Sequence, residues 1–342
     1  MLMAKHRIQL KDLAEQLGVN VATVSKALKD YPDISERTKK KVRKLAEQLN
    51  YMPDTQAGAL RGKRSYIIGL IIPEIVHFFF SNVINGIMNH VEENGYRLLI
   101  TLSGNSTDRE EKQLKLLFGA KVDGVLTSLA NETSDTSHFD ILRDHEIPVV
   151  LFDKVDDNLP FSQVTVDDMK GAYDATIHLI RRGCKRIAHI KGPRNPSNAK
   201  KRLDGYIKAL NDSKLDFDPD LVKECEEVTF EEGYQFCKEL LALPNPPDGI
   251  FAVTDQIGVA CINAARDGGF SVPEQLKVVG FSDSQIAQTS IPSLTTIHQP
   301  GYEIGETAAR LLIEEINKAT ESQVVQLQKQ VLETKLVRRG ST

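Results

Sequence analysis

The sequence is poor in cysteine and has no cysteine pattern that indicates a metal or redox site. Its only cysteines are Cys184, Cys225, Cys237 and Cys261. No two of them form a C-x-x-C pair, and no histidine lies at metal-ligand spacing from them. We therefore expect buried or partly buried free thiols in a reducing cytoplasm.

Long apolar segments are also missing. The first residues, MLMAKHRIQLKD, contain no apolar core long enough for a secretory signal. No run approaches the roughly 18 apolar residues that a membrane span needs. The sequence therefore predicts a soluble cytoplasmic protein that does not contact a membrane.

Motifs for phosphate binding or catalysis are absent too. No G-x-G-x-x-G follows the first expected strand, and no G-x-x-x-x-G-K-[ST] occurs. No Ser/His/Asp, Cys/His or H-E-x-x-H arrangement stands out. The paired carboxylates at 156–157 and 167–168 lie next to a turn and a helix start, where they serve as turn and cap residues. We expect no enzymatic activity, no cofactor and no metal site.

Charge is distributed unevenly along the chain. The formal net charge of −4 argues by itself against nucleic-acid binding. Residues 1–64, however, contain 14 basic and 7 acidic side chains, a net charge of +7, whereas the remainder carries −11. A basic head on an acidic body suits a protein that grips phosphates at one end and stays soluble. The alternative is chance asymmetry on a solvated surface.

Residues 10–28, LKDLAEQLGVNVATVSKAL, are typical of two short helices joined by a tight turn. Gly18 stands at the bend, where a left-handed backbone is needed. Asn20 can accept hydrogen bonds from the free N–H groups of the second helix. Apolar residues at i, i+4 spacing mark one face of each helix: Leu13, Leu17, Val24 and Leu28.

A helix, a glycine turn and a second helix of this size form a helix-turn-helix. In that motif the N-terminal residues of the second helix lie against base edges in the DNA major groove. Here those residues are Val21, Ala22, Ser25 and Lys26. The alternative is that this helix pair only packs a small core.

A third helix is expected after Ser35, its N-cap, with an apolar stripe at Val42, Leu45 and Leu49. Lysines and an arginine crowd its other side, and we expect most of them on a solvated face: Lys39, Lys40, Lys41, Arg43 and Lys44. Residues 54–60, DTQAGAL, can form about two helical turns. A helix this short is marginal alone, so the segment is expected to fold on DNA.

From Tyr66 onward, buried strands alternate with helices. Expected strands are 67–72, 97–102, 124–129 and 149–152, then 187–190, 250–253 and 277–281. Continuous apolar strands between helices indicate parallel sheets that are covered on both faces. Two such series predict two doubly wound lobes, and ligands in this architecture bind beyond the carboxyl ends of the strands.

Several motifs together resemble one family, the lactose repressor (LacI/GalR) family of bacterial transcription regulators, over essentially the whole chain. They are V-x-x-x-T-V-S at 19–25, L-N-Y at 49–51, A-x-x-L at 57–60, I-P-E at 72–74 with F-F at 79–80, V-D-G at 122–124, D-Q at 255–256, V-G-F at 279–281 and L-T-T-I-H-Q-P at 294–300.

The resemblance implies a dimer in which each helix-turn-helix reads half of a near-palindromic, double-stranded operator. Val21, Ala22 and Lys26 match base-reading positions, and Lys26 can donate to guanine O6 and N7. Leu60 matches a residue that wedges into the minor groove and kinks the duplex; otherwise it is an ordinary linker hydrophobe. The other DNA-contacting residues that we predict are Gln9, Leu10, Asn20, Thr23, Ser25, Lys29 and Ala57.

The resemblance also implies a periplasmic-binding-protein-like body with an effector, a carbohydrate or sugar derivative, between its lobes. Phe79 can stack on a sugar face, and Asp153 and Arg202 can hydrogen-bond hydroxyl groups. The remaining matched positions, some of which can instead be strand-end caps or interlobe hydrogen bonds, are Ser128, Asp255, Ser282 and Gln299.

Four positions depart from the usual family pattern. His77-Phe78 replaces a frequent Asn-Pro, Thr254 a common Asn, and Ser282 a position that is often Asp. Loss of that carboxylate removes a bidentate acceptor for paired hydroxyls. An acidic or modified sugar is therefore the hypothesis for the effector.

The sequence thus predicts an α/β chain with an all-α helix-turn-helix domain at 1–53, a hinge helix and linker at 54–65, and a body at 66–340. We expect the N-lobe at about 66–165 plus 296–325 and the C-lobe at about 166–295 plus 326–340. The segment 332–340 is expected as a last strand with a basic end. It lacks the leucine-heptad tail of tetrameric family members, so a homodimer is predicted.

The leading interpretation is a ligand-gated transcriptional repressor, with the direction of effector action left open. The alternatives are a cytoplasmic sugar-binding protein without operator-specific regulation and a sugar-acting enzyme.

Overall fold

The computed structural model describes residues 8–49, 51, 64–75 and 78–342. The chain divides between Ser65 and Tyr66 into two compact units, each of which has its own core. The described residues of the first unit form three helices, α1 (Leu10–Leu17), α2 (Val21–Leu28) and α3 (Glu36–Gln48). The second unit contains two parallel-stranded lobes, as the alternation of strands and helices predicts.

Local signals in the sequence account for the boundaries of the first two helices. Gly18 adopts φ +62° and ends α1 with its N–H bonded to carbonyls of the last turn. The side chain of Asn20 accepts the N–H of Thr23 at 2.7 Å and caps α2. Leu13, Val24 and Val42, one from each helix, are fully buried together.

Most of the basic residues of α3 are exposed, as expected, and Lys39 is the one of the five that the structure buries. Its ammonium nitrogen lies 3.0 Å from a carboxylate oxygen of Asp30 and 2.8 Å from one of Glu36. Arg43 also reaches Asp30, at 2.9 Å. Both basic side chains therefore tie α3 to Asp30, just after α2, Lys39 from a buried position and Arg43 from an exposed one.

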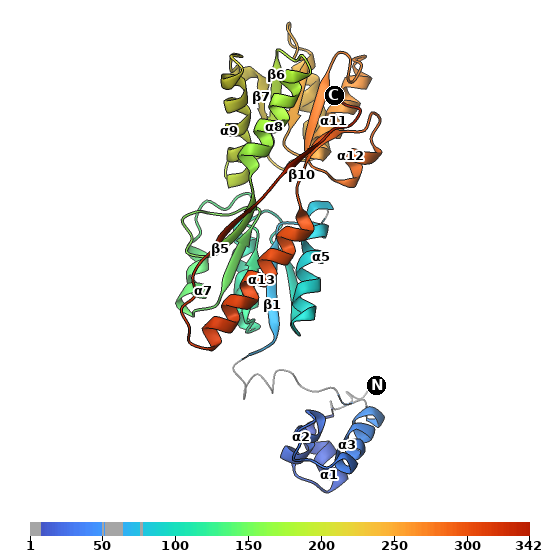
Figure 1. The fold of residues 1–342 in the computed structure, drawn as a ribbon, viewed down its shortest axis with the longest axis vertical. Coiled ribbons are helices and arrows are strands. Elements are labelled where there is room, and N and C mark those ends of the chain that lie inside the picture. The colour runs from blue at the N-terminus through green and yellow to red at the C-terminus, as the bar shows by residue number, and fades with distance from the viewer. Residues whose placement is uncertain (1–7, 50, 52–63, 76–77) are drawn as a thin grey trace, which may run out of the picture. The chain divides into compact units, whose positions relative to one another are not determined.

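The body contains two six-stranded sheets, one in each lobe (Figure 1). The N-lobe sheet has the order β11-β5-β4-β3-β1-β2 and the C-lobe sheet the order β12-β10-β9-β8-β6-β7. All pairs are parallel except β10 with β12. The strands are β1 (Ile67–Ile72), β2 (Arg97–Leu102), β3 (Gly124–Thr127), β4 (Val149–Phe152), β5 (Ser162–Val166), β6 (Ile187–Lys191), β7 (Val222–Glu224), β8 (Gly249–Ala252), β9 (Lys277–Ser282), β10 (Thr295–His298), β11 (Lys329–Leu332) and β12 (Lys335–Val337).

Helices cover both faces of each sheet, and each lobe has one apolar core on each face. In the N-lobe α5 and α13 cover one face and α6 with α7 the other, and in the C-lobe α8 and α9 lie opposite α10 and α11 (Figure 1). The helices are α5 (Phe78–Glu93), α6 (Thr107–Gly119), α7 (Asp140–Asp144), α8 (Asp168–Arg181), α9 (Ser197–Asp212), α10 (Phe230–Leu241), α11 (Asp255–Asp267), α12 (Gln285–Thr289) and α13 (Gly301–Thr320).

The last fifty residues cross between the lobes differently from the expected boundaries. Residues 296–298 were assigned to the N-lobe, but they belong to β10 in the C-lobe sheet. The expected single last strand is two strands: β11 pairs with β5 in the N-lobe, and β12 pairs with β10 in the C-lobe. The chain therefore connects the lobes three times, after β5, after β10 and between β11 and β12.

Within the described residues, every helix is too short or too polar to span a lipid bilayer.

Candidate functional site

The N-terminal half of α2 presents an exposed face in the first unit. Val21 has 40% of its surface exposed, and Ala22 and Lys26 are also exposed. Ser25 is half-buried. The capping of α2 explains this arrangement, because both the N–H and the hydroxyl of Thr23 donate to Asn20 Oδ1 and fix the first turn.

Lys26 forms an ion pair with Asp33, which lies in the segment between α2 and α3. The hydrogen bond between them raises the pKa of Lys26 and lowers that of Asp33. Both side chains are about half exposed, so water and salt screen the pair. The Lys26 ammonium is therefore positioned at the exposed face and can exchange Asp33 for another acceptor.

The other predicted DNA-contacting residues are placed as follows. Gln9 precedes α1, and its backbone N–H donates to Asp12 Oδ2 at 2.7 Å. Leu10 is half-buried at the start of α1, and Lys29 is exposed at the end of α2. Ala57 and Leu60 lie outside the described residues.

A cavity of about 570 Å³ lies between the two lobes of the body. Its volume is within the range that small-molecule sites occupy. It is bounded by segments that follow the carboxyl ends of β1, β4, β6, β8 and β9, where this architecture binds ligands. Of the predicted effector-binding residues, six line it: Phe79, Asp153, Arg202, Asp255, Ser282 and Gln299.

Ser128 is the predicted residue that does not line this cavity. Its side chain is fully buried, and its hydroxyl lies 3.5 Å from Asp153 Oδ2. On the other side Asn198, from α9 of the C-lobe, donates to Asp153 Oδ1 at 3.3 Å. Burial raises the pKa of Asp153. Ser128 thus contacts Asp153 from within the N-lobe. Asn198 contacts the same carboxylate from the C-lobe and so connects the two lobes.

Arg202 is held by three groups of the C-lobe. It forms an ion pair with Asp168 at 2.8 Å and donates from Nη1 to the carbonyl oxygen of Val253 at 2.7 Å. Its guanidinium carbon stands 3.7 Å from the ring centroid of Phe281. Three of its five N–H groups are used in this way, which leaves two for a ligand.

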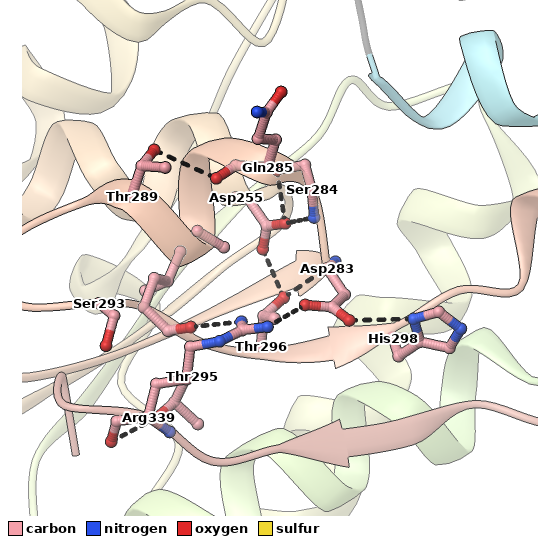
Figure 2. A network of polar contacts seen from close by, with 12 residues as sticks. Asp255, Asp283, Ser284, Gln285, Thr289, Ser293, Thr295, Thr296, His298 and Arg339 are labelled. Atoms are coloured by element: carbon pink, nitrogen blue, oxygen red, sulfur yellow. Dashed lines mark hydrogen bonds and ion pairs between the residues drawn. The ribbon is translucent and has the colours of Figure 1, made fainter.

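Asp255 lies at the start of α11 and accepts hydrogen bonds from neighbouring segments (Figure 2). Its Oδ2 receives the N–H of Ser284 at 2.6 Å and the hydroxyl of Ser284 at 2.8 Å. Its Oδ1 receives the hydroxyl of Thr296. Asp255 thus fixes Ser284, which also lines the cavity, to β10.

Asp283, next to Ser284, is held by the same network (Figure 2). Its Oδ1 lies 2.5 Å from Nη2 of Arg339, and its Oδ2 lies 3.1 Å from Nδ1 of His298. Arg339 follows β12, and its Nη1 donates to the carbonyl oxygen of Leu294 at 2.9 Å. Residues from β10 and from the end of the chain therefore clamp this part of the cavity wall.

Gln299 presents a buried donor that has no partner among the described residues. Its Oε1 accepts the Ser282 hydroxyl at 2.9 Å, whereas its Nε2 makes no hydrogen bond there. The residue is only 5% exposed. Because an unpaired buried N–H is costly, a ligand acceptor in the cavity is a natural partner.

Other cavity residues were not singled out from the sequence. Asn198 lies after β6, and Lys154 directly follows Asp153 after β4. Because ligands in this architecture bind beyond the carboxyl ends of the strands, both residues could have been found from their positions in the sequence. Burial lowers the pKa of Lys154, whose ammonium donates to the amides of Asn105 and Asn131. Val228 and Phe230 follow the short strand β7, which the hydropathy pattern does not mark.

The described residues contain no group of three or more His, Cys, Asp and Glu side chains that could hold a metal ion. All four cysteines are free and buried.

Comparison with known proteins agrees with both units. Residues 9–54 match "Bacterial regulatory proteins, lacI family", and residues 176–342 match "Periplasmic binding protein-like domain". The HTH-type transcriptional regulator RegA of Clostridium saccharobutylicum is 33% identical over 337 residues, which cover 97% of this chain and 98% of that protein. The HTH-type transcriptional repressor CytR of Escherichia coli K12 is 32% identical over 334 residues, 97% and 96% of the two chains.

Among solved structures, a complex of the transcriptional regulator CelR with cellobiose is 29% identical, with a TM-score of 0.74. The match covers 98% of this chain and 100% of that chain. Sequence identity at this level over nearly the full length of characterised regulators establishes the relationship. This chain belongs to the lacI family of bacterial transcriptional regulators.

Proposed function

We propose that this protein is a homodimeric repressor that binds a near-palindromic operator through α2 and the segment that follows α3. The observation that carries this proposal is the exposed face of α2, where Val21, Ala22 and Lys26 stand together in a unit of positive charge. The relative CytR is itself named a repressor. Regulation of this kind requires neither catalysis nor a cofactor, and it takes place where the DNA is, in the cytoplasm.

The cavity between the lobes is the proposed effector site. The polar atoms that remain available there suit a hydroxylated ligand: the unpaired Nε2 of Gln299, two N–H groups of Arg202 and the carboxylate of Asp153. The ligand of the similar CelR structure is cellobiose, which supports a carbohydrate. Because binding couplings are reciprocal, the effector and the operator must change each other's affinity by the same factor.

A selection from random duplex DNA tests operator binding. We expect wild-type protein to enrich a near-palindrome at near-physiological salt. Lys26→Ala should weaken the selected site about tenfold or change its sequence, because one base contact is lost. Lys40→Ala, which removes an exposed lysine from α3, is the matched control and should only weaken binding slightly at all sequences.

The outcomes separate this function from the main alternative. If the protein enriches no sequence, either alone or with a mixture of sugars, it is a sugar-binding protein without an operator. Sedimentation of the protein at micromolar concentration tests its assembly: a stable tetramer would contradict the proposed dimer.

A further inference from the structure

An acidic residue stands beside the exposed face of α2, in the part of the chain that carries net positive charge. Asp33 lies between α2 and α3, and its carboxylate pairs with the ammonium of Lys26. Their side chains are 52% and 47% exposed, so both remain accessible to a partner molecule. A carboxylate repels phosphate groups, so its presence at this face weakens the general affinity for DNA that the charge of this unit favours.

The segment between α2 and α3 holds Asp33 in a defined position. Asp30 turns the chain after α2 with φ +62°, and the N–H of Tyr31 donates to the carbonyl oxygen of Lys26 at 3.1 Å. Ile34, directly after Asp33, packs against the apolar core of the three helices. The backbone on both sides of Asp33 is therefore anchored, and the ion pair with Lys26 is built on a fixed frame.

The other ion pairs in the described part of this unit have a different role. Asp30 and Glu36 both bind Lys39, which is buried on α3, and Asp30 also binds Arg43. These pairs connect α3 to itself and to the end of α2. Asp33 is instead paired with a lysine that is predicted to read bases, and its contact therefore bears on recognition.

The ion pair changes what Lys26 can recognise. An unpaired ammonium is a point charge that binds phosphate groups at any sequence. Paired with Asp33, it adds no net charge, so its attraction to the DNA backbone is largely cancelled. The carboxylate uses one of its three N–H donors, and the other two can still donate to base acceptors such as guanine O6 and N7. The pair therefore keeps directional recognition of bases and loses the attraction that is independent of sequence.

We propose that Asp33 is a specificity-determining residue for operator binding, which holds Lys26 for hydrogen bonds to base edges and cancels its attraction to the phosphate backbone. This inference rests on the proposed operator binding and adds a residue that decides between operator and other DNA. Asp33 is a positioning residue, because it acts through Lys26.

The variant Asp33→Asn tests the proposal in the full-length protein. Fluorescence anisotropy measures its affinity for the operator that the wild type selects and for a scrambled duplex of the same length and composition, over a range of salt concentrations. The variant should bind the scrambled duplex about tenfold more tightly at low salt, because Lys26 is free to bind a phosphate. The slope of log affinity against log salt on that duplex should steepen by about 0.9, as expected for one added phosphate contact. The ratio of operator affinity to scrambled affinity should fall about tenfold.

Two further variants show whether Asp33 acts through Lys26. Glu36→Gln removes the same charge three positions away, from an exposed carboxylate that binds Lys39, and should change the ratio by less than about twofold. In a Lys26→Ala background, Asp33→Asn should no longer lower the ratio, because the lysine that it controls is absent. An unchanged ratio in Asp33→Asn, an equal loss in Glu36→Gln, or additive effects of Asp33→Asn and Lys26→Ala would overturn the proposal.

Failure here is distinct from failure of the proposed function. If the wild type selects an operator and Asp33→Asn keeps the wild-type ratio, the proposed function stands and only the role of Asp33 is refuted. If the wild type selects no sequence, both are refuted.

Discussion

Replacing Arg339 by glutamine tests whether the end of the chain supports the wall of the effector cavity. Arg339→Gln removes the ion pair to Asp283 at 2.5 Å and the hydrogen bond from Nη1 to the carbonyl oxygen of Leu294 at 2.9 Å (Figure 2). The backbone hydrogen bond from the Arg339 N–H to the hydroxyl of Thr295 remains possible in the variant.

The size of the effect follows from these two contacts. Hydrogen bonds to charged groups contribute about 1.5–3 kcal/mol each, and a buried charge that loses its partner costs more. Asp283 and Arg339 are largely but not fully buried, and His298 still reaches Asp283, so solvent and the histidine reduce the loss. We expect Arg339→Gln to lower the free energy of unfolding by about 3 kcal/mol.

Urea unfolding followed by circular dichroism measures this difference. Arg338→Gln, which changes the exposed neighbouring arginine, is the control and should change stability by less than about 0.5 kcal/mol. In the double variant with Asp283→Asn, the stranded charge is absent, so the combined loss should be smaller than the sum by about 1–2 kcal/mol. Equal stability of the two arginine variants, or strict additivity in the double variant, would refute the reasoning.

Two further stability effects are expected. Gly86→Ala on α5 should lower the free energy of unfolding by about 3 kcal/mol or more, because the added methyl group meets the backbone carbonyl oxygen of Tyr302 on α13. Gly119→Ala, where the added methyl group meets open space, is the control and should be neutral or mildly stabilising. Thermal unfolding measures both. Glu315 is 4% exposed, and burial raises its pKa from 4.5 to about 6, so the native state loses stability as the pH rises through that value. Glu315→Gln should therefore stabilise the protein by about 2 kcal/mol at about pH 8 and by less than half of that at about pH 5. A gain that does not depend on pH, or the same gain in the exposed Glu306→Gln on the same helix, would contradict this.

Elements with strong local signals could be predicted from the sequence. The boundaries of α1 and α2 depend on Gly18 and Asn20, which act within their own helices. The apolar strands β1, β2 and β4 were predicted with their observed bounds. By contrast, β5 (Ser162–Val166) is fully buried although it begins Ser-Gln, because the Ser162 hydroxyl donates to the buried Glu315 at 2.5 Å. Hydropathy cannot reveal a strand whose first residue, Ser162, finds its hydrogen-bond partner on a helix about 150 positions later.

The candidate site could likewise be predicted only in part from the sequence. Asp153 and Asp255 follow strand ends and Arg202, on α9, was predicted from the family resemblance, but the partners of all three in the structure could not be predicted. Asp168 forms an ion pair with Arg202, and the hydroxyl of Ser284 donates to Asp255. Each of these partners lies on a different segment from the residue that it contacts. Which of the five basic residues of α3 would be buried could not be predicted either, because Asp30, the carboxylate partner of Lys39, lies beyond the preceding turn. The sequence pattern thus predicts which residues lie near the cavity, whereas tertiary packing determines the hydrogen bonds and ion pairs that each of them makes.

The polar network of Figure 2 gives the cavity a physical route to the lobe connections. Asp283 is bound by His298, the last residue of β10, and by Arg339, which follows β12. Each of these strands borders a crossing between the lobes, and Gln299 lies within the crossing after β10. An effector that engages Gln299 or Ser282 therefore acts on the connections themselves. An effector can change how the two lobes are arranged only as far as it binds one arrangement of the lobes more tightly than another. Because Arg339 holds Asp283 next to these connections, variants at Arg339 should alter the effector's influence on operator binding, even though Arg339 does not line the cavity.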